Sequence, residues 1–302
     1  MINSLKQLLI FLISAVKMPF VSLSATICRR SFPLEIIPDE KTVEMIRDSG
    51  YSIARFGDGE FQWMMNKKGH SLFQASSKKL SKALSDALYS NKHKLLIGIP
   101  QALSNDKEYT FKAKYFWRNY LISNKEWLKK TLPKIAYCNA SITRPYLDYK
   151  NKATSLFRFD LVKSIWSNRH VLIIEGSNTK FGIGNDLLDN TLSVKRILAP
   201  AENSFERYEE IKASLLKHAR QDTLILLCLG PTATILAADQ ELESFQLVDI
   251  GHLDVEYEWC IANSTKKTAI KGKYVNEASS KGDSTYDECP LYKDSIIDRI
   301  DL

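Results

Sequence analysis

Short apolar runs alternate with helical segments along most of this chain. The strongest run covers residues 223–229, and similar runs cover 94–99 and 171–175. Each run is continuously apolar instead of alternating with polar residues, which is typical of strands buried on both faces of a parallel sheet. The segments 76–91 and 205–218 carry apolar residues at helical spacing. We therefore predict an α/β fold with a mostly parallel sheet flanked by helices.

The remaining segments continue the same alternation. Further strands are expected from Tyr51 and at 134–139, 194–198 and 245–250, and further helices from Asp39 and at 112–121, 156–167 and 231–236. With 302 residues the chain can bury a large core. We predict three regions: an amphipathic, membrane-associating segment at 1–37, one domain at 38–277, and a polar tail at 278–302 with a short helix near 296–300.

The net charge of the chain indicates which kinds of partner it can bind. A net charge of +7 favours anionic partners such as phosphates or anionic lipid. The chain has neither a helix rich in arginine and lysine nor zinc-ligand spacing, so no nucleic-acid partner is predicted. Its five cysteines are odd in number and far apart, which favours a reducing compartment.

The first thirty residues contain an apolar run at 8–16, shorter than the roughly 20 residues of a membrane span. We expect an amphipathic surface anchor, in which basic residues meet anionic headgroups and apolar residues enter the interface. The basic residues are Lys6, Lys17, Arg29 and Arg30, and the apolar ones Leu9, Phe11, Leu12, Phe20 and Val21. The alternatives are a helix packed on the domain and a signal peptide.

An acidic turn follows the strand that begins at Tyr51. Gly57 and Gly59 permit a tight turn around Asp58. In extended geometry Asp58 and Glu60 share one face, and two converging carboxylates suit Mg²⁺ or Mn²⁺ bound together with a phosphate. Arg55 can pair with a phosphate oxygen or with one of the acids. The alternative is a surface turn with solvated acids.

Two loops after predicted strands are candidates for phosphate binding, because ligands of open parallel sheets collect at the carboxyl ends of strands. Residues 176–186 are rich in glycine and small polar groups and include Lys180. They match neither the Walker A nor the dinucleotide fingerprint. Residues 230–234 place Pro231 at the start of a helix, whose free amides attract anions. The alternatives are an ordinary loop and simple helix capping.

The segment 249–259 follows directly on a strand and combines four carboxylates with a histidine and aromatic residues. Asp254 and Glu256 are candidates for a general base or for a ligand of a sugar hydroxyl. We expect His252 to make a structural hydrogen bond. A further acid–amide pair lies within residues 273–277.

Taken in order, five stretches of this sequence resemble the GT-D fold glycosyltransferases, bacterial enzymes that build surface glycans and have a Rossmann-like fold. The resemblance spans about residues 38–277. It rests on residues 55–60 (RFGDGE), 182–187 (GIGNDL), 230–234 (GPTAT), 249–259 and 273–277.

This resemblance implies a nucleotide-sugar site with a divalent metal. In the family the Asp-x-Glu motif is implicated in binding the metal, so Asp58 and Glu60 are expected to bind Mn²⁺ or Mg²⁺ with the diphosphate of a UDP-sugar. Members often have Ser-Arg where this chain has Thr179 and Lys180, and lysine lacks the bidentate fork of arginine. The expected nucleotide-sugar ligands are Arg55, Asp58, Arg144, Lys180, Gly184, Asn185, Asp186, Gly230, Thr232 and Thr234.

The resemblance also implies a reaction: transfer of a hexose, glucose or galactose, from the UDP-sugar to a growing O-antigen, capsule or glycoprotein glycan. An inverting reaction needs a base, for which Glu277 is our first choice and Glu256 and Asp254 follow. We expect a cytoplasmic enzyme, peripheral on the inner face of the membrane, whose acceptor is a glycan that can be lipid-linked. The alternative functions are a non-catalytic membrane-associated nucleotide-binding module and a metal-dependent phosphohydrolase.

Overall fold

The computed structural model describes residues 2–66 and 73–300. Eight strands form one sheet in the order β10-β5-β4-β6-β7-β1-β2-β3, and every neighbouring pair is parallel. The strands are β1 (Ser52–Arg55), β2 (Leu95–Ile99), β3 (Cys138–Asn139), β4 (His170–Gly176), β5 (Ser193–Ala199), β6 (Leu224–Cys228), β7 (Gln246–Asp249) and β10 (Ile296–Arg299). A small antiparallel pair joins β8 (Tyr274–Val275) to β9 (Ser280–Lys281). The predicted mostly parallel α/β fold is confirmed.

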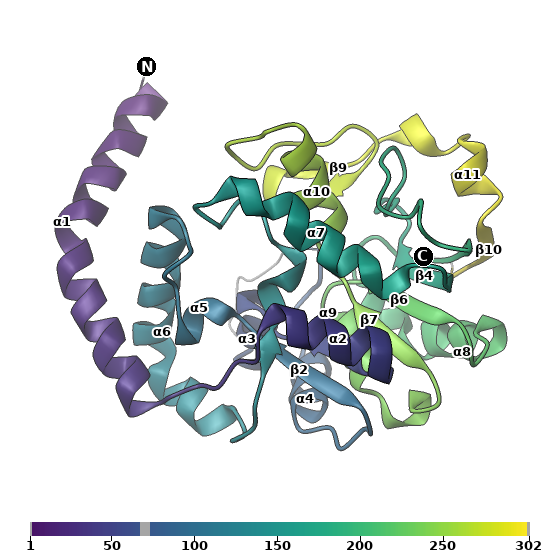
Figure 1. Ribbon diagram of the computed structural model, residues 1–302, viewed down its shortest axis with the longest axis horizontal. Helices are drawn as coiled ribbons and strands as arrows, with labels where there is room; N and C mark the ends of the chain where they lie inside the picture. The colour runs from purple at the N-terminus through teal and green to yellow at the C-terminus, as the bar shows by residue number, and fades with distance from the viewer. Residues whose placement is uncertain (1, 67–72, 301–302) are drawn as a thin grey trace.

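Helices cover both faces of the sheet (Figure 1). The α-helices of the described residues are α1 (Ile2–Ser31), α2 (Asp39–Ser49), α3 (Asp58–Met64), α4 (Lys78–Leu88), α5 (Gln101–Ser104), α6 (Phe111–Thr131), α7 (Ser155–Lys163), α8 (Tyr208–His218), α9 (Pro231–Ala238), α10 (Leu253–Ile261) and α11 (Pro290–Lys293). The position of β6 between two cores explains why this strand is apolar at every residue. Ile225 and Leu227 face one core, while Leu224 and Leu226 face the other.

The segment near the C-terminus departs from the prediction. The short helix expected near 296–300 is wrong, because residues Ile296–Arg299 form β10 and extend the sheet beside β5. The Arg196 amide donates to the Ser295 carbonyl at 2.7 Å, and the Ile300 amide donates to the Leu198 carbonyl at 2.8 Å. The pairing partner lies about a hundred residues away in the chain, so the local sequence pattern carries no signal for it.

The N-terminal segment forms one continuous helix, α1, which lies beside α6 (Figure 1). Residues Phe11–Ser31 form a 21-residue stretch that is long and apolar enough to cross a membrane by length and composition. The expectation drawn from the run at 8–16 is therefore too narrow, since the helix continues through Lys17 and Pro19 and its apolar stretch exceeds that run. Signal sequences and core helices of soluble proteins meet the same test.

Candidate functional site

The centre of the candidate site is an ion pair between the last residues of two neighbouring strands. β1 and β7 are parallel neighbours, so Arg55 and Asp249 end at the same edge of the sheet. The Arg55 guanidinium contacts the Asp249 carboxylate at 2.6 Å, and its Nε donates to the Asp249 carbonyl at 2.7 Å. Its Nη1 donates to Ala140 and Thr143. The acid that pairs with Arg55 is thus Asp249 and not Asp58 or Glu60 of the turn, which were the acids that we predicted.

A side chain of helix α9 contacts both partners of this ion pair. The Thr234 hydroxyl donates to the Arg55 carbonyl at 2.9 Å and lies 3.3 Å from the Asp249 carboxylate. Thr232 is buried with its hydroxyl 3.2 Å from that of Ser204. Gly230, which precedes the helix, has a φ of 53°, and a Cβ there would lie 2.2 Å from the Phe73 ring. These residues of the predicted phosphate loop are therefore engaged in shaping the site.

The acidic turn does not have the extended geometry that we predicted. Asp58 and Glu60 lie in the first turn of α3, where residues two positions apart point in different directions. The Glu60 carboxylate turns back to accept a hydrogen bond from the Gly57 amide at 2.8 Å, closing the helix end. Burial raises the pKa of Glu60 to about 7, and the nearby Asp249 carboxylate adds to the shift.

Tyr120 of α6 completes this acidic corner, and the sequence analysis did not identify it. Its hydroxyl is buried and has no hydrogen-bond partner among the described residues. Burial raises the pKa of Tyr120, and the neighbouring Asp58 and Glu60 carboxylates raise it further. The tyrosine lies in an aromatic-rich helix whose local pattern indicates packing only, so nothing in the sequence relates it to an acidic turn sixty residues earlier.

To hold a divalent cation together with a diphosphate, Asp58 and Glu60 would need the Glu60 carboxylate to leave the Gly57 amide and turn toward Asp58. The unpartnered Tyr120 hydroxyl is a polar group for which an incoming ligand would provide a partner, whereas the Glu60 carboxylate already accepts from the Gly57 amide. Within the described residues no group of three histidine, cysteine or acidic side chains is arranged to hold a metal alone. A cation bound by Asp58 and Glu60 would therefore have coordination positions free for phosphate oxygens. Mg²⁺ is commonly bound in this way in nucleotide sites.

Glu277, our first choice for the base, lies in a cluster of basic groups. Its carboxylate contacts Arg144 at 2.9 Å, His252 at 3.1 Å and Lys267 at 3.8 Å. Burial alone would raise the pKa of Glu277, but His252 and Arg144 outweigh burial and hold it well below its ordinary value. A carboxylate with such a low pKa is a poor proton acceptor, so this geometry argues against Glu277 as the base.

The other two candidate bases have structural contacts. Asp254 is buried and accepts from Lys273 at 2.7 Å and from the Gly182 amide at 3.0 Å. Glu256 is buried and accepts from the backbone amides of Tyr146 and Leu147 at 3.2 and 3.0 Å. Both side chains lie on the buried helix α10, whereas we predicted them as a general base or as ligands of a sugar hydroxyl. Neither carboxylate is placed to receive a proton from a substrate.

The glycine-rich loop also turns its polar groups inward. The Lys180 amine is buried and contacts the Asp287 carboxylate at 2.7 Å, which differs from the phosphate contact that we predicted. Asn185 donates to Asp254 and Glu258. Asp186 pairs with Lys163 at 2.9 Å. At Gly184 a Cβ would lie 2.4 Å from the Tyr286 hydroxyl. The segment 283–287 provides the neighbours of Lys180 and Gly184, whereas Asn185 pairs with α10 and Asp186 with α7. All of these partners lie too far along the chain for the local sequence pattern to indicate them.

Comparison with known proteins agrees with the fold. A family model described as the glycosyltransferase GT-D fold matches residues 53–278. The chain is 31% identical over 273 residues to glycosyltransferase GlyD of Streptococcus pneumoniae serotype 4, covering 89% of this chain and 33% of that protein. It is also 31% identical over 266 residues to a probable glycosyl transferase, Gly, of Streptococcus gordonii, covering 87% of this chain and 38% of that protein. The chain thus spans between a third and two fifths of the length of these curated relatives.

Solved structures give the same result. One, reported to show that the highly conserved domain of unknown function 1792 has a distinct glycosyltransferase fold, is 32% identical with a TM-score of 0.84 and covers 93% of this chain and 100% of its own. Another, a new glycosyltransferase of the same domain type from Streptococcus sanguinis, is 29% identical with a TM-score of 0.82 and covers 89% of this chain and 100% of its own. The parallel sheet, the acidic turn after β1 and these matches together show that the chain belongs to the GT-D fold glycosyltransferase family.

Proposed function

We propose that this protein transfers a hexose, glucose or galactose, from a UDP-sugar to a hydroxyl of a growing surface glycan such as an O-antigen, capsule or glycoprotein glycan. The observation that carries the proposal is the acidic corner at the carboxyl end of β1. There Asp58, the buried Glu60 carboxylate and the unpartnered Tyr120 hydroxyl lie beside the Arg55–Asp249 ion pair. Sheets of this class bind nucleotides at this edge.

Asp58 and Glu60 would hold Mn²⁺ or Mg²⁺, and Tyr120 would donate a hydrogen bond to an oxygen of the bound donor. When bound, the cation neutralises the charge that develops on the leaving diphosphate. The Arg55–Asp249 pair holds the end of β1, from which the acidic turn leaves the sheet. Arg144, whose side chain is partly exposed, supplies a fixed positive charge at the same edge.

His252 is the group that best fits the role of base if the reaction inverts the anomeric centre. Its Nε2 lies 3.1 Å from the Glu277 carboxylate, and its side chain is partly exposed, so the ring can be reached from the site. Burial lowers the pKa of His252, the Arg144 charge lowers it further, and the Glu277 carboxylate opposes the shift. Under this proposal His252→Gln lowers kcat and leaves the KM for the donor unchanged. A fall in donor affinity with unchanged kcat would assign His252 to binding instead.

One assay tests the proposed activity and its rivals. The protein is incubated with several UDP-hexoses and Mn²⁺, and UDP release is followed with and without a glycan acceptor. We expect acceptor-dependent release, loss of release in EDTA, and a loss of at least a hundredfold in Asp58→Asn. Asp86→Asn, an exposed acid of α4, is the matched control. Release independent of acceptor would favour the phosphohydrolase, and donor binding without release would favour the binding module.

We further propose that the enzyme works in the cytoplasm on the inner face of the membrane, where it meets a lipid-linked acceptor. Nucleotide sugars are made in the cytosol, and the basic charge of the chain suits an anionic surface.

A further inference from the structure

Helix α1 has its apolar face turned away from the protein. Small and polar residues such as Ser14, Ser22 and Ala25 face the domain and are buried or half-buried. The opposite face carries a row of large apolar side chains at spacings of three and four residues, so that they form one stripe. The stripe consists of Leu9, Leu12, Ile13, Val16, Phe20, Leu23 and Ile27, of which Val16 is 73% and Phe20 75% exposed. A helix of a soluble domain would pack this face inward.

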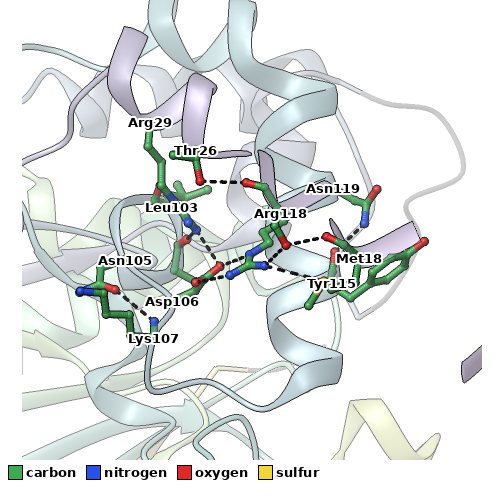
Figure 2. A network of polar contacts seen from close by, with 12 residues as sticks. Met18, Thr26, Arg29, Leu103, Asn105, Asp106, Lys107, Tyr115, Arg118 and Asn119 are labelled. Atoms are coloured by element: carbon green, nitrogen blue, oxygen red, sulfur yellow. Dashed lines mark hydrogen bonds and ion pairs between the residues drawn. The ribbon is translucent and has the colours of Figure 1, made fainter. Parts of the chain in front are cut away.

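A buried carboxylate clamps α1 to the domain in this orientation (Figure 2). Asp106, only 4% exposed, contacts Arg29 of α1 at 2.9 Å and Arg118 of α6 at 2.7 Å. Arg29 also donates to the carbonyls of Leu103 and Ala102 at 3.1 and 2.7 Å. Arg118 donates to the Ser22 hydroxyl of α1 at 2.5 Å. The orientation of α1 is therefore fixed by charge-assisted hydrogen bonds rather than by apolar contact alone.

The clamp extends toward the active site through α6. The Phe11 and Phe111 rings pack with centroids 5.3 Å apart, so the two helices are in contact from near their beginnings. Arg118, which closes the clamp, lies two residues before Tyr120, whose hydroxyl faces the acidic corner. The apolar stripe, the clamp and the site therefore belong to one packed unit.

The chemistry of α1 favours an anionic bilayer as the partner of the stripe. The helix contains four basic residues and no acidic residue, and its Lys17 and Arg30 are exposed. A second copy would bring the same positive charges together with no acid on α1 to pair with them. On the side away from the stripe lie the charged groups Asp106 and Arg118, which could not enter hydrocarbon alongside a spanning helix. The helix therefore fits the plane of the interface.

We infer that α1 docks the enzyme on an anionic membrane with its apolar stripe in the lipid interface, and that it does so as a rigid part of the catalytic domain instead of as a flexible tether. This inference deepens the membrane location proposed above. The docking is tested by experiments that do not measure sugar transfer. The docking inference can therefore fail while the proposed reaction stands, and the proposed reaction can fail while the docking inference stands.

Flotation with vesicles of phosphatidylglycerol and phosphatidylcholine tests the docking face. Full-length protein is expected to float at low salt, and Val16→Asp/Phe20→Asp to lose binding more than about tenfold, because two apolar side chains no longer enter the interface. Leu192→Asp/Leu291→Asp, which changes two exposed leucines elsewhere, is the control and should float normally. Equal flotation of the two double variants would overturn the inference. A second result would also overturn it: the full-length protein fails to bind vesicles and instead forms dimers in sedimentation experiments, in a concentration-dependent way that Val16→Asp/Phe20→Asp abolishes.

Hydrogen exchange without lipid tests the rigid clamp. Amides of residues 20–31 are expected to be protected in the native protein. Arg29→Gln removes the ion pair between α1 and Asp106 and leaves Arg118 bonded to Asp106 and to Ser22, so it should speed exchange at the end of α1 and leave β6 unchanged. The control, Arg207→Gln, removes one partner of the exposed Arg207–Glu210 ion pair, which lies far from α1 in the sequence. Exchange in native α1 as fast as in an isolated helix would show a tether and contradict the rigid-body inference.

Discussion

At the scale of single residues, buried charges in this protein find partners that are distant in sequence. Lys180 is paired with Asp287, and Lys273 with Asp254. An ammonium or carboxylate loses several kcal/mol of hydration on burial, so a partner is needed wherever the fold encloses one. A lysine in a glycine-rich loop can therefore serve the loop's own structure, whereas the residues left for a ligand are those without such a partner, above all Tyr120 among the described side chains.

Lys180→Met distinguishes a structural lysine from a phosphate ligand. Because the amine contacts Asp287 and the Asp283 carbonyl, we expect the variant to be less stable by about 1–3 kcal/mol, with an unchanged KM for the donor. Urea unfolding and donor titration measure the two quantities. The exposed Lys293→Met, which loses an exposed ion pair nearby, should change neither. A raised KM with unchanged stability would restore the original phosphate role.

At the scale of elements, helix ends and strand edges decide how segments join. The end of α9 is an example. The Lys92 side chain is buried, and its amine donates to the Ala237 carbonyl at 2.9 Å, near the end of the helix. A cation at a helix C-terminus is favourable, but here burial dominates and lowers the pKa of Lys92 to about 8, with Asp239 and Glu243 opposing the shift.

The lowered pKa of Lys92 predicts that the free energy of unfolding depends on pH. Between about pH 8 and 10.5 the unfolded chain still holds this proton while the folded protein has released it, so its contribution to the free energy of unfolding rises with pH, by up to roughly 3 kcal/mol. Lys92→Met lacks this contribution. Urea unfolding at pH 7.5 and pH 10 should show the stability of the wild type increasing relative to the variant. The same comparison with the exposed Lys82→Met should show no such change, and a constant difference for Lys92→Met would refute the assignment.

At the scale of the whole molecule, the sheet, α6 and α1 form one structure. Ala25 and Cys28 of α1 are buried in the domain, and Arg29 pairs with the buried Asp106. The sequence alone led us to place residues 1–37 outside the domain of residues 38–277. The contacts indicate instead that the second half of α1 contributes to its stability.

Two truncations test this. Deletion of residues 1–31 should lower the free energy of unfolding by on the order of 2–4 kcal/mol, because it exposes apolar surface and leaves Asp106 with one partner. Deletion of residues 1–13, which ends before the first buried residue described in α1, should change it little. Chemical unfolding of both variants provides the comparison. Equal stability would mean that α1 is detached from the domain in solution.

Most of the strands and helices followed from the sequence because each depends on local pattern. Continuous apolar runs such as 223–229 indicate a sheet covered on both faces, and strand ends such as Arg55 and Asp249 then meet at one edge. The motif resemblance identified the family for the same reason, since its residues are read in order along the chain.

What each side chain does was decided only by the tertiary structure. Glu277 has its low pKa because Arg144 and His252 surround it, and Glu60 has its high pKa because the fold buries it beside Asp249. Electrostatic and desolvation effects depend on distances between groups that are far apart in sequence. Strand β10 and the orientation of α1 depend in the same way on partners about a hundred residues away, β5 for one and α6 for the other.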